Sequence, residues 1–459
     1  MKTFPITNSA LCWLEIILSE RFGHEWDLQR VEQSLVLKLK GMEGAVVFDN
    51  LEECFTLSRS DLPCIRWDAD AEGWCSVLGG LLPAPGVTYL PAPLIELRGA
   101  NYIIHYDILG LTYWMLARVE EIGRTDLDNH DRFPATASHA FRHGYLDRPV
   151  VDEWLHVLGQ VVLLQWSGIE LKRHEFKMRV SHDVDRPFQY LFVPGKSIAR
   201  QVAGDIVKRK SVMLGWQRYR NWMAVRGGDL QRDPFNTFDW IMDQSERHGL
   251  RSAFYFLCGR TNQAMDADYD VEHPKIRDLL RRIHERGHEI GIHPSYETYR
   301  KPGLIKQEFE RLKRACDEEG IHQVDWGGRM HYLRWEQPTT MQAWNDAGLT
   351  YDSSLYYAAH AGFRCGTCHE YTMYDPTDQA ILSLTQRPLI LMDCSVVEPI
   401  YMGLGLGKEA IEYSRCLIDI CQKVQGQFTI LWHNSSFETS EHYEFFQNTL
   451  GWRGVPDDD

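Results

Sequence analysis

The feature that most constrains the fold is a regular alternation of short β-runs and amphipathic segments from about residue 175 onward. Between the β-runs, segments such as 276–283, 305–316 and 411–421 place apolar residues three and four positions apart, which is typical of packed helices. Strands that alternate with such helices form parallel sheets. The predicted strands are 176–181, 252–257, 289–293, 323–326, 350–352, 389–392 and 428–432.

Seven strands joined by helices favour a (β/α)7 barrel over an open, doubly wound sheet, although the strand pattern alone fits both. A chain of 459 residues exceeds the usual size of one hydrophobic core. We therefore expect an α/β protein in two parts, with a smaller α/β N-terminal domain over 1–170 and the barrel over 171–459. The segment 190–232 is rich in Arg, Lys and Trp and predicts a helical insertion or lid.

The first 170 residues predict two helices, at 107–121 and 149–164, between aromatic-rich runs and turn clusters. This part of the sequence contains no clustered set of acids, bases or metal ligands. We therefore expect it to form an accessory domain that takes no part in bond cleavage.

The charge and cysteine content narrow the class of protein. A formal net charge of −15 argues against an extended surface for nucleic acid or anionic membranes. Eleven cysteines scattered through apolar runs indicate reduced thiols, and no apolar run is long enough to span a bilayer, so we expect a cytoplasmic chain without a membrane span. One local basic patch is present, formed by Lys208, Arg209, Lys210, Arg218, Arg220 and Arg226.

Polar side chains gather where the predicted strands end, which is the edge that carries the active sites of parallel β/α proteins. Asp183 and Asp185 follow the first strand, and side chains two residues apart project to the same side of an extended chain. Because neighbouring carboxylates repel, a metal cation would stabilise the pair. His293 and His433 end two other strands, where imidazole can bind metal or transfer a proton. The alternatives are an exposed acidic turn and structural histidines.

Four motifs occur in a fixed order: Ser-His-Asp-Val-Asp at 181–185, Gly-His-Glu-Ile-Gly-Ile-His-Pro-Ser-Tyr at 287–296, Arg-Met-His-Tyr at 329–332 and Leu-Trp-His-Asn at 431–434. This set resembles the motifs of the polysaccharide deacetylases, also called the NodB homology family or carbohydrate esterase family 4. Segments 107–121, 131–134 and 144–152 are similar to the accessory domain of a bacterial subgroup. The resemblance implies a NodB-type (β/α)7 barrel.

The resemblance also implies a reaction, the metal-dependent removal of an acetyl group from an N-acetylated or O-acetylated sugar or polysaccharide precursor. The expected cofactor is a divalent ion, zinc in the first instance. The implied roles are Asp183 as catalytic base, His433 as general acid, Asp185 and His293 as metal ligands, Arg329 as support for the base, and the backbone N–H of Tyr332 as a donor to the oxyanion.

The sequence departs from the family pattern at two positions. Family members usually carry histidine where this chain has Glu297, and a proline before the residue that matches Tyr332. A carboxylate can also bind zinc, so Glu297 is the expected third metal ligand, but it could instead turn away. In that case the neighbouring candidates to replace it are His182, His331 and His369.

The segment Cys365-Gly-Thr-Cys368-His369 matches the spacing of a haem attachment site, but a cytoplasmic chain argues against haem. A structural zinc would need two more ligands at similar spacing, and the sequence has no second Cys-x-x-Cys. We therefore expect a plain loop that lines the substrate cleft.

Two other functions compete with deacetylation. The same fold family includes amidohydrolases that act on small non-sugar amides or cyclic ureides. A catalytically silent carbohydrate-binding protein would be expected if Glu297 marks a lost metal site. The expected partner is thus a carbohydrate or another small acetylated molecule.

Overall fold

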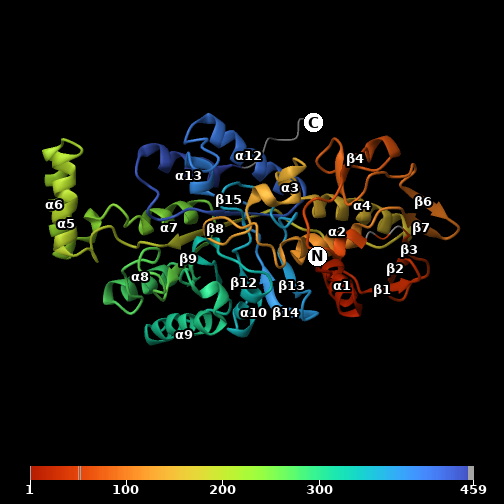
Figure 1. Ribbon diagram of the computed structural model, residues 1–459, viewed down its shortest axis with the longest axis horizontal. Helices are drawn as coiled ribbons and strands as arrows, with labels where there is room; N and C mark the ends of the chain where they lie inside the picture. The colour runs from red at the N-terminus through yellow and green to blue at the C-terminus, as the bar shows by residue number, and fades with distance from the viewer. Residues whose placement is uncertain (1, 50, 52, 453–459) are drawn as a thin grey trace.

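The computed structural model describes residues 2–49, 51 and 53–452, and it is a mixed α/β protein (Figure 1). The second part of the chain forms a nine-stranded sheet in the order β13-β14-β12-β11-β10-β9-β8-β16-β15. Neighbouring strands are parallel except for β13 and β14, which form an antiparallel hairpin. The strands are β8 (Lys177–Val184), β9 (Ser252–Leu257), β10 (Glu289–His293), β11 (Gly327–Gly328), β12 (Tyr351–Asp352), β13 (Tyr371–Asp375), β14 (Ala380–Gln386), β15 (Leu391–Met392) and β16 (Gln427–Leu431).

The sheet is not closed into a barrel, because no ladder joins β15 to β13 within the described residues. The expected (β/α)7 barrel is therefore not confirmed, although six of the seven predicted strands overlap strands of the sheet. The sequence analysis also missed the hairpin β13–β14, which extends one edge. The helices of this part are α5 (Gly195–Val207), α6 (Val212–Arg226), α7 (Phe238–Arg247), α8 (Pro274–Glu285), α9 (Pro302–Glu318), α10 (Thr339–Asp346), α11 (Asp393–Val397), α12 (Lys408–Lys423) and α13 (Ser440–Gly451).

The predicted strand at 323–326 is displaced to Gly327 and Gly328 for a steric reason. A Cβ on Gly328 would lie 1.8 Å from the carbonyl oxygen of Ile292, so only glycine allows this approach to β10. At the predicted position, the Gln323 side chain instead accepts a hydrogen bond from the Ile290 N–H and donates one to the Ile290 carbonyl. The Gln323 side chain thus makes the two hydrogen bonds to the Ile290 backbone that a neighbouring strand would otherwise make.

The N-terminal part has a five-stranded sheet in the order β1-β2-β3-β7-β6 and a separate pair, β4 and β5. The predicted helix at 149–164 is present as α4, while the one at 107–121 is shorter and ends as a 3-10 turn. The elements are α1 (Asn8–Phe22), β1 (Trp26–Val31), β2 (Ser34–Leu39), β3 (Val46–Phe48), β4 (Cys64–Trp67), β5 (Leu82–Pro85), β6 (Ile95–Arg98), β7 (Asn101–Ile104), α2 (Ile108–Leu116), α3 (His139–Arg142) and α4 (Val150–Gln165).

The two parts share one continuous hydrophobic core. Trp13 of α1 stacks on Tyr374 of the hairpin at 5.2 Å between ring centroids, and its indole N–H donates to the Thr372 carbonyl. A buried ion pair also crosses the boundary, since Glu121 accepts hydrogen bonds from both Arg118 and Arg364. The first part is therefore fixed against the large sheet.

The insertion expected at 190–232 contains the hairpin of α5 and α6. Its base has a small core of its own, formed by Tyr190, Ile198 and Val225. Figure 1 shows this hairpin standing away from the body of the molecule, at the end opposite the N-terminal part.

Candidate active site

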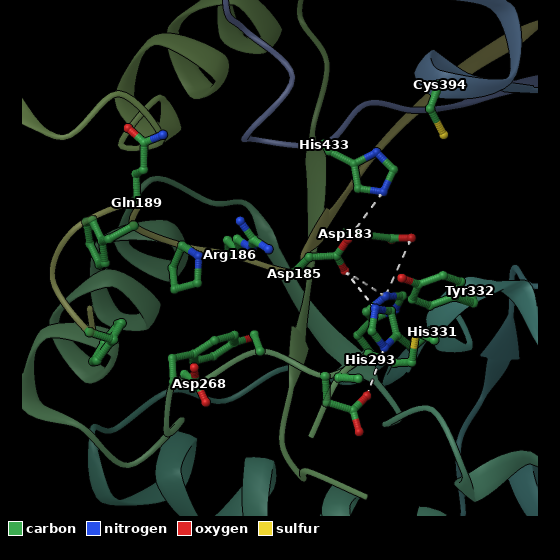
Figure 2. A pocket seen from close by; sticks show the side chains of 18 of the residues that line it. Asp183, Asp185, Arg186, Gln189, Asp268, His293, His331, Tyr332, Cys394 and His433 are labelled. Carbon is green, nitrogen blue, oxygen red and sulfur yellow. Dashed lines mark hydrogen bonds and ion pairs between the residues drawn. The ribbon is translucent and has the colours of Figure 1, made fainter. Parts of the chain in front are cut away.

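The polar residues predicted at the strand ends converge on one cavity of about 520 Å³ (Figure 2). Asp183 lies at the end of β8, Asp185 directly follows that strand, and His293 is the last residue of β10. His433 follows β16, the neighbour of β8 on its other side. Because these strands are parallel and adjacent, their ends bring side chains far apart in the sequence to the same place.

Asp185, His293 and His331 form a group that could hold a metal ion. Oδ1 of Asp185 lies 3.2 Å from Nε2 of His293 and 3.5 Å from Nε2 of His331. This oxygen is buried and has no hydrogen-bond partner. A buried carboxylate oxygen without a donor is costly unless a cation satisfies it.

Hydrogen bonds on the far side of each ring fix which nitrogen faces the group. Nδ1 of His293 donates to the carbonyl oxygen of Arg329 at 2.6 Å, and Nδ1 of His331 donates to Asp266 at 3.0 Å. When its ring is neutral, each histidine therefore turns an unprotonated Nε2 toward Asp185. Metal-binding histidines are usually held in this way by a second hydrogen bond. The donor set thus fits a divalent ion such as zinc.

Without an ion, the acidic and imidazole side chains of the group shift the pKa values of one another in opposite directions. Burial raises the pKa of Asp185, but the neighbouring imidazoles of His331, His293 and His433 outweigh it and hold the pKa well below the usual range. Burial lowers the pKa of His293, while Asp183 and Asp185 raise it above its ordinary value.

Glu297, the expected third ligand, is not part of this group. Its carboxylate lies 3.5 Å from Arg334 and accepts a hydrogen bond from Asn262, because the chain after His293 turns instead of continuing as a helix. His331 lies where the third ligand was expected. His331, the residue before Tyr332, was one of the candidates named to replace Glu297, and it belongs to the group.

The Asp183 side chain is held in position by a buried arginine. Its Oδ1 accepts a hydrogen bond from Arg329 Nη1 at 2.7 Å. Arg329 is in turn fixed by Ser181 and by the carbonyl and hydroxyl of Ser353. Oδ2 of Asp183 lies 3.9 Å from Nε2 of His293, so it borders the candidate metal group.

His433 lies on the other side of Asp185, with Nε2 3.7 Å from Asp185 Oδ2. Its Nδ1 donates to Asp393 at 2.8 Å, and its backbone N–H donates to the second oxygen of the same carboxylate. Burial lowers the pKa of His433, but the charges of Asp393, Asp185 and Asp183 outweigh it and raise the pKa to about 10. Asp393 was not among the residues predicted from the sequence, although it directly follows the predicted strand 389–392.

The N-terminal part reaches the cavity, contrary to expectation. Arg132 lines the cavity and donates a hydrogen bond of 2.9 Å to the carbonyl oxygen of Tyr332. His130 lies against the Tyr332 ring, with 4.8 Å between ring centroids. Tyr332 has a φ of 60°, a left-handed conformation that is unfavourable for tyrosine and needs such support. A loop of the accessory part thus braces a predicted site residue.

His182, one of the proposed substitutes for the third ligand, has a structural role. It is buried, with Nδ1 donating to the Trp432 carbonyl and Nε2 bonded to Ser252. Both ring nitrogens therefore have partners away from the candidate metal group.

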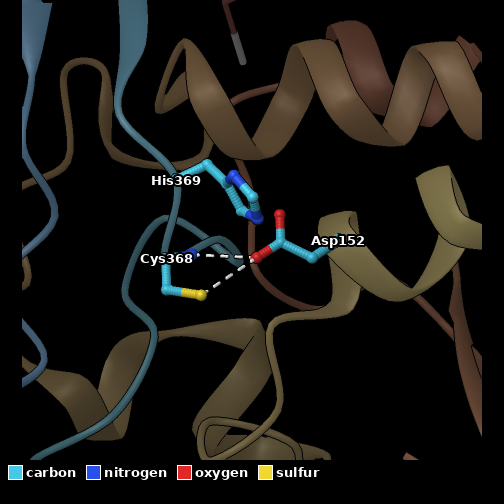
Figure 3. A group of neighbouring side chains, drawn as sticks. All are labelled: Asp152, Cys368 and His369. Carbon is cyan, nitrogen blue, oxygen red and sulfur yellow. Dashed lines mark hydrogen bonds between the residues drawn. The ribbon is translucent and has the colours of Figure 1, made fainter. Parts of the chain in front are cut away.

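The Cys-x-x-Cys-His segment does not line the cavity. Figure 3 shows Cys368 and His369 of this segment beside Asp152. Cys368 accepts through its carbonyl from Gln427 at the start of β16, whereas His433 follows the other end of that strand. Cys368 and His369 lie beside Asp152, but this carboxylate is satisfied by Arg21, Thr367 and the Cys368 N–H. Burial raises the pKa of the Cys368 thiol, so this group does not favour a metal.

The N-terminal part of the chain matches one described family. A family described as a family of unknown function (DUF7033) matches residues 5–167. No curated protein matches the chain. Within the described residues, no helix has the length and apolar character needed to cross a bilayer.

Solved structures resemble the larger part of the chain at low similarity. A candidate polysaccharide deacetylase from Mycobacterium smegmatis has a TM-score of 0.39 and 17% identity, covering 63% of this chain and 87% of its own. Puue allantoinase has a TM-score of 0.36 and 11% identity, with coverages of 62% and 85%. A candidate polysaccharide deacetylase from Pseudomonas aeruginosa PAO1 has a TM-score of 0.37 and 12% identity, with coverages of 60% and 84%. Similarity this low does not establish an activity.

Proposed function

We propose that this protein is a metal-dependent hydrolase that removes an acetyl group from an N-acetylated or O-acetylated sugar or sugar precursor. One observation carries the proposal. The group of Asp185, His293 and His331 lies between a carboxylate held by an arginine, Asp183, and an imidazole held by a carboxylate, His433. Metal-assisted hydrolysis of an amide or ester uses a base, a proton donor and a Lewis acid at one point.

Asp185, His293 and His331 would hold the ion, which would act as a Lewis acid on the acyl oxygen. Asp183 is the base, because Arg329 fixes one of its oxygens and leaves Oδ2 toward the cavity. This oxygen takes the proton of the attacking water. Arg329 also keeps the carboxylate oriented while it accepts that proton.

His433 supplies a proton to the departing amine or alcohol. The carboxylate of Asp393 stabilises the imidazolium, so the ring is protonated when the substrate binds. The backbone N–H of Tyr332 is the proposed donor to the developing oxyanion. Arg132 holds the carbonyl of the same residue and so fixes this peptide in place.

The size and the lining of the cavity favour a carbohydrate, small or extended, as the substrate. Its volume of about 520 Å³ lies within the usual range for small-molecule sites. Its wall contains Phe188, Phe192, Tyr332 and Tyr401 beside polar groups, a combination that suits the apolar faces and hydroxyls of a sugar ring.

The test combines metal analysis with product detection. Protein purified without chelator is expected to contain about one zinc-like ion and to release acetate from N-acetylglucosamine oligomers. Asp183→Asn should retain the ion and lose nearly all turnover, whereas Asp185→Asn should lose both. Ammonia or ring-opened product from allantoin, without acetate release, would favour the small-amide alternative. Absence of both metal and turnover would refute the proposal.

A further inference from the structure

The hairpin of α5 and α6 exposes apolar side chains that no part of the described chain covers. Along α6, Val212, Trp216, Tyr219 and Met223 follow one another at steps of four, three and four residues, so they share one helix face. They are 68%, 63%, 42% and 50% exposed, respectively. We call these four residues the α6 stripe. An isolated exposed apolar residue is ordinary, but a continuous stripe on one face indicates a binding surface.

The surroundings of the stripe are strongly basic. Residues 195–226 contain eight Lys and Arg and one acidic residue, a local net charge of +7 in a chain of −15. The acidic residue, Asp205, is already paired with Arg209 and Arg218. The turn between the helices is formed by Lys208, Arg209, Lys210 and Ser211, and Val207 before it is 74% exposed. The hairpin therefore presents apolar and positive groups together, without competing acids.

The aromatic residues on α6 have the chemistry of an interface between water and lipid. The rings of Trp216 and Tyr219 lie 6.2 Å apart, and those of Tyr219 and Trp222 lie 6.0 Å apart. Tryptophan and tyrosine favour the headgroup region, where an apolar ring and a polar edge are both satisfied. A helix with one apolar face and flanking Lys and Arg is typical of helices that lie in the surface of an anionic bilayer.

We propose that this hairpin docks the protein on the surface of an anionic lipid membrane, with the α6 stripe in the headgroup layer and the basic turn at the lipid phosphates. Charge complementarity favours lipid over a protein partner, because each basic side chain near an anionic surface strengthens binding about fivefold and no acidic side chain opposes it. The separate small core at the hairpin base holds the two helices as a stiff arm.

The position of the hairpin relates docking to the candidate site. Ser197 and Gln201 on the first turns of α5 line the same cavity as Asp183 and His433. A hairpin docked on a membrane would therefore hold the cavity mouth near the bilayer. If the proposed hydrolase function holds, the substrate class is an acetylated sugar carried on a membrane-anchored lipid.

The test is flotation of the full-length protein with vesicles of phosphatidylcholine alone or with 30 mol% phosphatidylglycerol. Wild-type protein should float with the anionic vesicles, and high salt should weaken this binding. Trp216→Ser with Met223→Ser should weaken it by about tenfold or more, and Lys208→Glu with Lys210→Glu by at least about 25-fold, because the change removes two positive charges and adds two negative ones. All four side chains are exposed, so the fold should be retained.

Matched controls test whether the location matters. Tyr89→Ser with Val324→Ser removes two apolar side chains that are 73% and 91% exposed elsewhere, and should leave flotation unchanged. Lys306→Glu with Lys313→Glu makes the same charge change on α9 and should have a much smaller effect. Failure of the wild type to float would refute the proposal. So would a concentration-dependent dimer that the α6 stripe variant abolishes, because a second copy would then cover the stripe.

The docking test does not depend on turnover, so the two proposals can fail separately. Vesicle binding without acetate release from any acetylated sugar would refute the hydrolase and leave docking intact. If both hold, the α6 stripe variant should lose acetate release from a lipid-linked substrate in anionic vesicles and retain it on the same sugar in solution. Equal loss on both substrates would contradict the link between docking and the cavity.

Discussion

Replacing His331 should remove metal binding, while replacing Glu297 should not. The structure places Nε2 of His331 3.5 Å from the unpartnered oxygen of Asp185, whereas Glu297 lies against Arg334 and Asn262. Structural zinc sites bind with about 10–16 kcal/mol, or about 2.5–4 kcal/mol per ligand when four ligands share this free energy. Loss of one ligand therefore predicts a fall in affinity of about 10²- to 10³-fold.

The assay is competition between the metal-free protein and a chromophoric zinc chelator at neutral pH. His331→Gln should show the predicted fall, and Glu297→Gln, the matched neutral substitution, should bind zinc like the wild type. Thermal unfolding of both metal-free variants would verify that each is folded. If Glu297→Gln loses affinity and His331→Gln keeps it, the ligand assignment is wrong.

A graded effect is expected at Asp266, which holds His331 without belonging to the metal group. Asp266 is buried and accepts the Nδ1 hydrogen bond of His331 together with the backbone N–H groups of Thr261, Asn262 and Tyr296. Asp266→Asn should lower zinc affinity by about 10- to 100-fold, the usual effect of losing such a support. If Asp266→Asn lowers the stability but binds zinc like the wild type, Asp266 only holds the loop backbone and does not support His331 as a ligand.

Two further predictions concern pH dependence and stability. Asp393→Asn removes the charge that raises the pKa of His433, so the ring should lose its proton at lower pH and the alkaline limb of the rate profile should move to lower pH. An unmoved alkaline limb would exclude His433 as the acid. Glu121→Ala should cost about 3–5 kcal/mol in urea unfolding, because Arg118 and Arg364 would stay buried without their shared carboxylate. Glu25→Ala at an exposed ion pair is the control and should change stability little.

The strand ends could be predicted from the sequence because each is encoded locally. A buried β-run followed by Asp183 and Asp185, or by His293, identifies both the strand and the edge at which it ends. The parallel arrangement then brings these residues together without further information. The displaced strand at Gly327 shows the limit of this signal, since the close approach to Ile292 requires residues that carry no strand propensity.

The proposed third ligand, His331, could not be located in the same way, because its position depends on loops. Glu297 and His331 both lie beyond strand ends, and their directions are set by contacts with distant residues, Arg334 for one and Asp266 for the other. The sequence named both as candidates but offered no means to choose between them. A charge argument favours His331 as the proposed ligand, since a neutral imidazole adds no repulsion to a group that contains Asp185 and is bordered by Asp183.

The same dependence on distant contacts explains why the N-terminal part was expected to lie outside the site. Arg132 closes a run that contains Asp128, His130 and Asp131, but the sequence places this run in a polar loop between two helices and does not link it to the strand ends that carry the site. Its importance comes from Tyr332, whose left-handed backbone must be held by an external partner, and Arg132 donates to the carbonyl of that residue. The N-terminal part therefore contributes to the cavity by holding the Tyr332 peptide in place through Arg132. The continuous core that joins the two parts keeps Arg132 in position.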